Sequence, residues 1–129
     1  MSEIDSKTRR ILLVEDDPGY QELMETMLRK TCQITICSSA EEALEKLARE
    51  RFDLVISDVN LLGMTGFEVL GRIKAAGPGK ECPVVLCSSN HDQFTREKAV
   101  AMGAAHFLPK PYDPQTVQDL VSKLIVARP

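Results

Sequence analysis

The sequence lacks both a membrane segment and an excess of basic residues. No apolar run approaches the roughly 20 residues that cross a bilayer, and the polar segment Met1–Thr8 lacks the apolar core of a signal peptide. The formal net charge is −3 and the pI is near 5.4, whereas nucleic acid or an anionic membrane calls for a basic face. We therefore expect a cytoplasmic protein with no direct nucleic-acid or membrane partner.

The cysteines also lack a spacing that suits a metal site or a disulfide. Cys32 and Cys37 form one C-x4-C pair, and Cys82 and Cys87 form another. Side chains five residues apart in an extended strand point to opposite faces, so neither pair is suited to share a metal or to bond. We expect small, buried hydrophobic residues at these positions.

The composition is that of one globular domain. The 129 residues are 43% apolar and 27% charged, which is ordinary for a folded protein of this size. We expect a single domain over residues 1–129, with a core at about 9–127, because no linker or repeat divides the chain. The sequence leaves open whether this domain acts alone or comes from a longer protein.

Short apolar runs alternate with segments whose apolar residues recur at helical spacing. The runs are continuous, as strands buried on both faces require. They lie at 10–14, 33–37, 53–57, 83–87 and 105–108. Helices are expected at 18–30, 39–48, 66–75, 92–102 and from Pro114 onwards, with a break at Gly77-Pro78-Gly79. This order predicts an α/β fold, a doubly wound five-stranded parallel sheet with five helices.

Two of these helices begin with capping signals. Asp17 precedes Pro18, and proline is favoured at the first position of a helix. The segment Ser39-Ala40-Glu41-Glu42 is a capping box, in which the serine and the last glutamate satisfy free backbone N–H groups. Asp17 is therefore expected to cap a helix rather than to bind a ligand.

Polar residues follow the predicted strands where these end. In a doubly wound sheet, ligands bind beyond the carboxyl ends of the strands, where the strand order reverses. We therefore expect three carboxylates, a hydroxyl and an ammonium group to converge at one edge of the sheet. The residues are Glu15 and Asp16 after the first strand, Asp58 after the third, Ser88 and Ser89 after the fourth, and Lys110 after the fifth.

Three carboxylates in one place need a counter-charge. Two unit charges about 4 Å apart repel by about 4 kcal/mol at an effective dielectric of 20, and Mg²⁺ with oxygen ligands relieves this repulsion. If one carboxylate then accepts a phosphoryl group, the metal neutralises charge, a lysine pairs with phosphoryl oxygens and a hydroxyl bonds another. The strand ends supply each of these groups.

Four motifs together resemble the receiver domain of two-component response regulators, the CheY-like family. They are LLVEDDP at 12–18, LVISDVNLLGMTGFEVL at 54–70, PVVLCSS at 83–89 and MGAAHFLPKPY at 102–112. Each motif alone is modest, but their order and spacing are highly specific. The resemblance extends from about Arg10 to Val126 and implies a flavodoxin-like fold of receiver type.

The resemblance implies a role for each member of the predicted site. Asp58 is the expected phosphoacceptor and also a metal ligand. Glu15 and Asp16 are the expected acidic pair for Mg²⁺, and the backbone carbonyl of Asn60 completes the protein ligands. A histidine kinase or phosphotransfer protein is the expected phosphoryl donor. Such a domain is not an enzyme, although it promotes its own phosphorylation and dephosphorylation.

The resemblance also implies a switch. Ser88 supplies the hydroxyl, Lys110 pairs with the phosphate, and Lys110-Pro111 is expected to be a cis peptide bond. Phe107 is the aromatic residue that changes rotamer on activation. This change alters the surface made by helix 92–102, strand 105–108 and the final helix. The altered surface is expected to bind an unknown downstream protein or to form a homodimer.

The chain departs from the family pattern at four positions. Leu62 stands where a proline is common, which predicts a less rigid loop, and Ser88 replaces the more usual threonine. Ser89 replaces a small apolar residue, which would alter solvent access to the acyl phosphate and its lifetime. Glu15 is a longer first acid that can reach the metal through water. None of these changes removes a required group.

Other residues and other functions have simpler interpretations. Asp53 is expected at the surface, His91 in a surface loop and His106 in a strand. A phosphatase with an aspartyl-phosphate intermediate needs an acid two residues after the nucleophile, where this chain has Asn60. A flavin or nucleotide scaffold needs a glycine-rich loop where this chain has EDDP. A receiver without phosphorylation is disfavoured because every required group is present.

Overall fold

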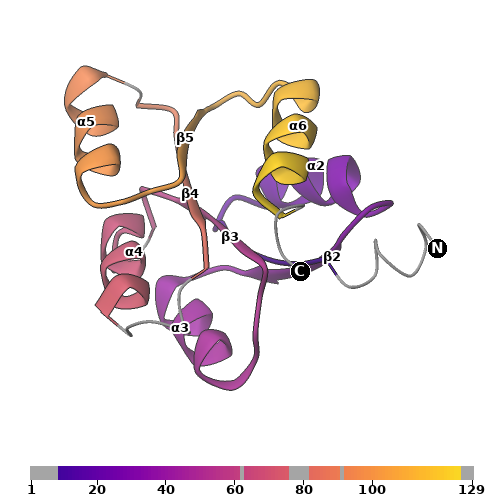
Figure 1. The fold of residues 1–129 in the computed structure, drawn as a ribbon, viewed down its shortest axis with the longest axis horizontal. Coiled ribbons are helices and arrows are strands. Elements are labelled where there is room, and N and C mark those ends of the chain that lie inside the picture. Colours follow the sequence, from indigo (N-terminus) through magenta and orange to yellow (C-terminus); the bar gives the residue numbers. More distant parts are fainter. Residues whose placement is uncertain (1–8, 62, 76–81, 91, 126–129) are drawn as a thin grey trace.

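The computed structural model describes residues 9–61, 63–75, 82–90 and 92–125 (Figure 1). Its strands are β1 (Arg10–Val14), β2 (Gln33–Cys37), β3 (Leu54–Asp58), β4 (Val84–Ser88) and β5 (His106–Pro109). The helices between and after them are α2 (Pro18–Leu28), α3 (Ala40–Arg49), α4 (Gly66–Ala75), α5 (Gln93–Ala101) and α6 (Pro114–Ile125). The predictions for Leu62, for His91 and for the break at 77–79 lie outside the described residues.

The strands form one parallel sheet in the order β2-β1-β3-β4-β5. The chain therefore leaves β1 toward one edge and continues from β3 toward the other edge. The order reverses between β1 and β3, where Ile11 pairs with Leu54 and Val14 with Ser57. The predicted doubly wound sheet is confirmed, and its switch point lies at the carboxyl ends of β1 and β3.

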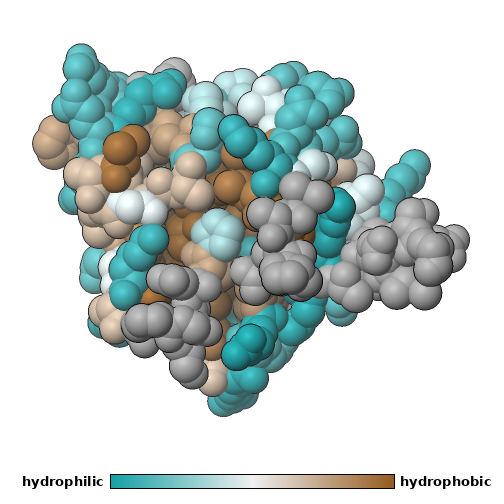
Figure 2. Space-filling view, viewed as in Figure 1, coloured by the Kyte–Doolittle hydropathy of each residue, from teal (hydrophilic) through white to brown (hydrophobic). Residues whose placement is uncertain are grey.

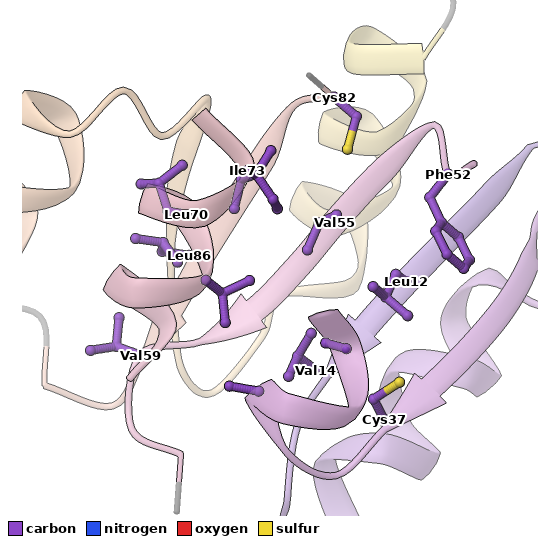
Figure 3. Packing of buried hydrophobic residues seen from close by; sticks show 14 of the residues in the cluster. Leu12, Val14, Cys37, Phe52, Val55, Val59, Leu70, Ile73, Cys82 and Leu86 are labelled. Carbon is purple, nitrogen blue, oxygen red and sulfur yellow. The ribbon is translucent and has the colours of Figure 1, made fainter. Parts of the chain in front are cut away.

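Helices cover both faces of the sheet (Figure 1). On one face, α3, α4 and α5 pack over a core that includes Leu12, Val55 and Leu86 (Figure 3). On the other face, α2 and α6 pack over a core that includes Leu13 and Ile56. Successive strand residues thus enter opposite cores, which explains why the strands are apolar throughout.

The outer surface is polar around these cores. In the orientation of Figure 1, Figure 2 shows apolar residues in the middle, between the two helix layers, and hydrophilic residues around most of the rim. None of the helices in the described ranges combines the length and apolar character that a bilayer crossing requires.

All four cysteines are buried thiols, as predicted. Cys37 and Cys82 lie in the core under α3, α4 and α5, whereas Cys32 and Cys87 lie in the core under α2 and α6. Each C-x4-C pair is therefore divided between the two faces of the sheet. Cys32 and Cys82 precede β2 and β4 rather than lying within strands.

Three strands begin and end one residue later than predicted. The predicted runs were 53–57, 83–87 and 105–108, and the observed strands are 54–58, 84–88 and 106–109. Just before β3, the side chain of Asp53 is drawn toward β1, and its Oδ2 accepts a hydrogen bond from Arg10 N at 2.8 Å. The prediction that Asp53 is a surface residue is therefore only partly right, since it is half-buried. As a result of the shift, Asp58 is the last residue of β3 and not the first residue after it.

The predicted helix caps are present, with one difference. The Oδ1 of Asp17 accepts a hydrogen bond at 2.9 Å from the backbone N–H two residues later, and α2 ends at Leu28, two residues before its predicted end. Ser39 Oγ accepts a hydrogen bond from Glu42 N at 3.2 Å. Glu42 Oε1, however, accepts from Ser38 N at 2.9 Å rather than from the capping serine.

Candidate functional site

The acidic cluster, which consists of Glu15, Asp16 and Asp58, lies at the switch point of the sheet. Glu15 and Asp16 directly follow β1, and Asp58 ends the neighbouring strand β3. One carboxylate oxygen from each of these residues lies within 4.8 Å of the other two. The fold thus brings together three carboxylates from two distant parts of the sequence, as the pattern at the strand ends predicted.

Glu15 is held firmly inside the protein, with 1% of its surface exposed. Its backbone N–H donates to Cys37 O at 2.9 Å, at the end of β2, and its Oε2 accepts from Asp17 N at 3.1 Å. Its Oε1 lies 2.7 Å from Lys110 Nζ but receives no hydrogen bond of suitable angle from the described residues. A buried carboxylate oxygen in that condition is available as a ligand atom.

Lys110 joins two members of the acidic cluster. Its Nζ lies 2.7 Å from Glu15 Oε1 and donates a hydrogen bond to Asp58 Oδ2 at 3.0 Å. The residue is only 7% exposed although it is charged. Its backbone N–H donates to Ser88 O at 3.0 Å, which ties it to the end of β4. The Lys110–Pro111 peptide bond is cis, as predicted.

Burial and neighbouring charges shift the pKa values of Glu15 and Lys110. Burial raises the pKa of the Glu15 carboxyl, although Lys110 and the N–H of Asp17 oppose the rise. Burial also disfavours the charged form of Lys110, but its contacts with Glu15 and Asp58 outweigh burial and raise the pKa of the lysine. Lys110 therefore stays charged at neutral pH, and the ionised form of Glu15 depends on a cation beside it.

The acidic cluster fits a small divalent cation. Oxygen ligands about 2.1 Å from Mg²⁺ lie roughly 3 to 4 Å apart, so side chains within 4.8 Å of one another need only a small adjustment. The donor atoms are all carboxylate oxygens, which Mg²⁺ prefers. Asp16 is half-buried, so the cluster opens to solvent at this residue and leaves room for water ligands.

The loop after β3 lies against Asp58. Its Oδ1 accepts a hydrogen bond from Asn60 N at 3.3 Å, so the backbone that the resemblance implies as a metal ligand lies next to the carboxylate. Further along, Gly66 N donates to Val59 O at 2.9 Å where α4 begins. A Cβ atom on Gly66 would lie 2.2 Å from Asp58 O. Only a glycine lets the helix begin this close to Asp58.

Ser88 and Phe107 lie on the strands beyond β3. Ser88 ends β4, is fully buried, and accepts a hydrogen bond from Asn90 N on its Oγ at 3.0 Å. The residue before it pairs with Asp58 in the sheet, so Ser88 lies next to the acidic cluster. Phe107 lies in β5 and is 8% exposed. The guanidinium carbon of Arg96, from α5, lies 5.2 Å from the centroid of its ring.

Two tyrosines lie beside Lys110. The ring centroid of Tyr20, in the first turn of α2, lies 4.1 Å from Lys110 Nζ. Tyr20 meets Tyr112 edge to face, with ring centroids 5.3 Å apart and planes at 75°. Tyr112 is buried, and its hydroxyl lies beside the thiol of Cys87. Burial raises the pKa of both groups, that of Cys87 to about 12.

The sequence pattern identifies the charged members of this site but misses two of its neighbours. It places Tyr20 on the apolar face of a helix and does not indicate the contact with Lys110. A signal was available, because the third residue of a helix that begins just after the acidic pair lies near the strand ends. The role of Gly66 has no sequence signal, since it depends on a contact in space. His106 lies in a strand, as predicted, and is the exposed first residue of β5. Ser89 is also exposed.

A doubly wound parallel sheet with an acidic cluster and a buried lysine at its switch point defines the class of response-regulator receiver domains. The family model for the response regulator receiver domain matches residues 11–122. The chain therefore belongs to this family, and the predicted membership is confirmed. It is a receiver domain of two-component signalling, and its acidic cluster fits the phosphoacceptor site of such domains.

Relatives support the same family. The chain is 41% identical over 115 residues to the response regulator protein FleR of Pseudomonas aeruginosa, a match that covers 88% of this chain and 24% of FleR. It is 34% identical over 120 residues to an uncharacterized 14.6 kDa protein of Leptolyngbya boryana, and this match covers 92% of each chain. The chain thus spans only about a quarter of the first relative's length.

Solved structures share the fold. The chemotaxis response regulator CheY4 of Vibrio cholerae superposes with a TM-score of 0.81 at 27% identity, over 89% of this chain and 97% of that one. The receiver domain of the sensor histidine kinase PA1611 of Pseudomonas aeruginosa gives a TM-score of 0.83 at 28% identity, over 92% and 98%. That receiver domain holds a magnesium ion in its active-site cleft.

Proposed function

We propose that this receiver domain accepts a phosphoryl group on Asp58. The donor is a phosphohistidine of a histidine kinase or phosphotransfer protein. Mg²⁺ is held by the acidic cluster and the backbone carbonyl of Asn60. The observation that carries this proposal is the contact of Lys110 with both Glu15 and Asp58. A buried ammonium group beside Asp58 lies within reach of the oxygens of an incoming phosphoryl group.

The chemistry needs little from the protein beyond position and charge. A carboxylate oxygen of Asp58 attacks phosphorus, the bond from phosphorus to the histidine nitrogen breaks, and the nitrogen keeps the electron pair. When bound, Mg²⁺ neutralises charge on the phosphoryl oxygens. Lys110 pairs with one of these oxygens, and the hydroxyl of Ser88 donates a hydrogen bond to another. The domain in this way promotes its own phosphorylation and later dephosphorylation.

Phosphorylation then changes the surface that α5, β5 and α6 share. The phosphoryl group adds about 1.5 to 2 negative charges, and Ser88 moves so that its hydroxyl donates a hydrogen bond to a phosphoryl oxygen. Phe107 changes rotamer in response. Since Phe107 is already only 8% exposed, its ring moves within the core beneath Arg96 rather than entering from solvent.

The energy that such a switch needs is moderate. A change from 1% to 99% of the active state requires phosphorylation to favour that state by about 5.5 kcal/mol, and a few charge-assisted hydrogen bonds supply this. The altered surface binds a downstream protein or a second copy of the chain. We also propose that residues 1–129 form a single receiver domain with its core at about 9–127; residues 62, 76–81, 91, 126 and 127 of this core lie outside the described ranges.

The proposal is tested by phosphate uptake from acetyl phosphate. We expect the wild-type protein to gain one acid-labile phosphate in the presence of Mg²⁺ and none after chelation. Asp58→Asn should gain none, because an amide cannot attack phosphorus. Asp119→Asn, which changes an exposed carboxyl on α6, is the matched control and should behave as wild type. Uptake by Asp58→Asn at the wild-type rate would overturn the assignment.

A further inference from the structure

Tyr20 takes no part in the chemistry described above, yet its ring lies over the lysine of the site. Lys110 Nζ is 4.1 Å from the ring centroid, inside the limit of about 6 Å for a cation–π contact. Tyr20 is half-buried and Lys110 is 7% exposed. The contact is therefore partly shielded from water, where cation–π attraction is stronger than at an open surface.

The ring completes the surroundings of the ammonium group. A lysine ammonium has three N–H donors and no acceptor. Around Lys110 Nζ lie Asp58 Oδ2 at 3.0 Å, Glu15 Oε1 at 2.7 Å and the ring face of Tyr20. Of these three partners, only Tyr20 lies outside the acidic cluster.

The two carboxylates change partners in the proposed reaction, whereas the ring does not. Glu15 and Asp58 turn to the metal, and Asp58 also bonds phosphorus, so neither can hold Lys110 in one place throughout. A ring face carries no net charge and does not compete for the metal. Tyr20 is itself held by its edge-to-face contact with the buried Tyr112.

We propose that Tyr20 is a positioning residue for Lys110, whose ring face keeps the ammonium group beside Asp58 while the carboxylates exchange partners. This inference rests on the proposed function, because it concerns the phosphorylation of Asp58. With acetyl phosphate as donor, the bond from phosphorus to the acetyl oxygen breaks, acetate leaves with the electron pair, and an Asp58 oxygen forms the new bond. Tyr20 does not touch these atoms and acts through Lys110.

Two substitutions separate the ring face from the rest of the side chain. Tyr20→Phe keeps the ring face, whereas Tyr20→Leu keeps an apolar side chain without it. We expect the rate of phosphate uptake from acetyl phosphate to fall about threefold to tenfold in Tyr20→Leu and to stay near the wild-type rate in Tyr20→Phe. Leu23→Ala, which changes an exposed residue of the same helix, is the control for damage to α2.

A second measurement needs no phosphorylation. The chain has two tyrosines and no tryptophan, so Tyr112→Phe leaves Tyr20 as the sole tyrosine emitter. In that background we expect Lys110→Ala to change the intensity of Tyr20 fluorescence, because the adjacent cation is lost. Lys123→Ala removes an exposed lysine of α6 and should leave the emission unchanged.

The outcomes distinguish this inference from the proposed function. If the wild-type protein takes up no phosphate, the proposed function fails and the inference fails with it. If it takes up phosphate and Tyr20→Leu does so equally fast, only the inference is overturned. Equal losses in Tyr20→Phe and Tyr20→Leu also overturn it, since the ring face then has no special role. If circular dichroism shows that Tyr20→Leu is unfolded, the fluorescence comparison decides, and unchanged emission in Lys110→Ala refutes the inference.

Discussion

A Cβ atom on Gly66 would lie 2.2 Å from the backbone oxygen of Asp58 and 3.0 Å from its carbonyl carbon. Neither atom is the end of a flexible side chain, so the backbone itself would have to move. The start of α4 and the end of β3 are therefore fitted to each other, and the position of the proposed phosphoacceptor depends on a residue without a side chain.

Gly66→Ala is expected to destabilise the fold and to disturb the site. The added methyl group overpacks the junction, which typically costs about 1–3 kcal/mol in the free energy of unfolding, and phosphate uptake on Asp58 should slow as that residue shifts. Gly71→Ala, in the same helix, would place its Cβ 3.8 Å from Met102 Cε, an ordinary contact, and should stabilise the helix by about 0.5–1 kcal/mol. Urea denaturation of both variants measures the difference, and equal stabilities would contradict the steric argument.

The neighbours Asp16 and Asp17 should separate metal binding from helix capping. Asp16 belongs to the acidic cluster, so Asp16→Asn is expected to weaken Mg²⁺ binding by roughly tenfold or more, because the affinity of such a site depends on the number of charged ligands. Asp17 instead accepts a hydrogen bond from Gly19 N at 2.9 Å. Asp17→Ala should cost about 1 kcal/mol of stability with little change in Mg²⁺ affinity. Calorimetric titration with Mg²⁺ and thermal unfolding test the two variants. A large loss of Mg²⁺ affinity in Asp17→Ala, with none in Asp16→Asn, would contradict the assignment of the two roles.

Arg96→Ala should loosen the ring of Phe107. The guanidinium carbon lies 5.2 Å from that ring centroid, and a contact of this kind is worth about 0.5–1 kcal/mol at an accessible site. Lys98→Ala is the matched control on α5, since Lys98 Nζ lies 4.4 Å from the ring centroid of Phe67 instead. With fluorophenylalanine at the four phenylalanines, the Phe107 resonance should move in Arg96→Ala toward its value in beryllofluoride-treated wild type. In Lys98→Ala only the Phe67 resonance should move. An unchanged Phe107 resonance in Arg96→Ala would refute the coupling between Arg96 and the Phe107 ring.

Stability should fall as the pH rises above about 9. Burial raises the pKa of Cys87 from 9.0 to about 12 and that of Cys37 to about 11. Between the ordinary and the raised pKa the unfolded chain has lost these protons while the folded chain keeps them, so the free energy of unfolding decreases by about 1.4 kcal/mol per pH unit for each thiol. Below pH 9 both states are protonated and the contribution is constant.

Cys87→Ala should therefore flatten the dependence of stability on pH between 9 and 11. Val85→Ala, at a buried position of the same strand, should lower stability equally at every pH because it removes no titrating group. Denaturant unfolding at pH 7, 9 and 10.5 makes the comparison. An unchanged slope in Cys87→Ala would show that this thiol titrates normally in the folded protein.

Much of the fold was readable because the sequence signals were local and agreed with one another. Continuous apolar runs indicated strands covered on both faces, and the acids after the first and third runs indicated where the site would lie. Two details were missed. Asp53 contacts the backbone of Arg10, which lies 43 residues away in the sequence and comes near it only in the fold. Glu42 reaches Ser38 N instead of Ser39 N, because neighbouring backbone donors compete for one side chain and spacing does not decide between them.

By itself, the sequence determined which groups this protein brings to its site, because the ends of parallel strands must share one edge of the sheet. Tertiary structure alone decided how those groups meet. Lys110 contacts both Glu15 and Asp58. The ring of Tyr20 lies over the ammonium group of Lys110. Gly66 has no Cβ atom and so leaves space for the backbone of Asp58. Such contacts join segments that are distant in the chain, and their distances follow from the packing of whole helices and strands, which no local pattern of residues records.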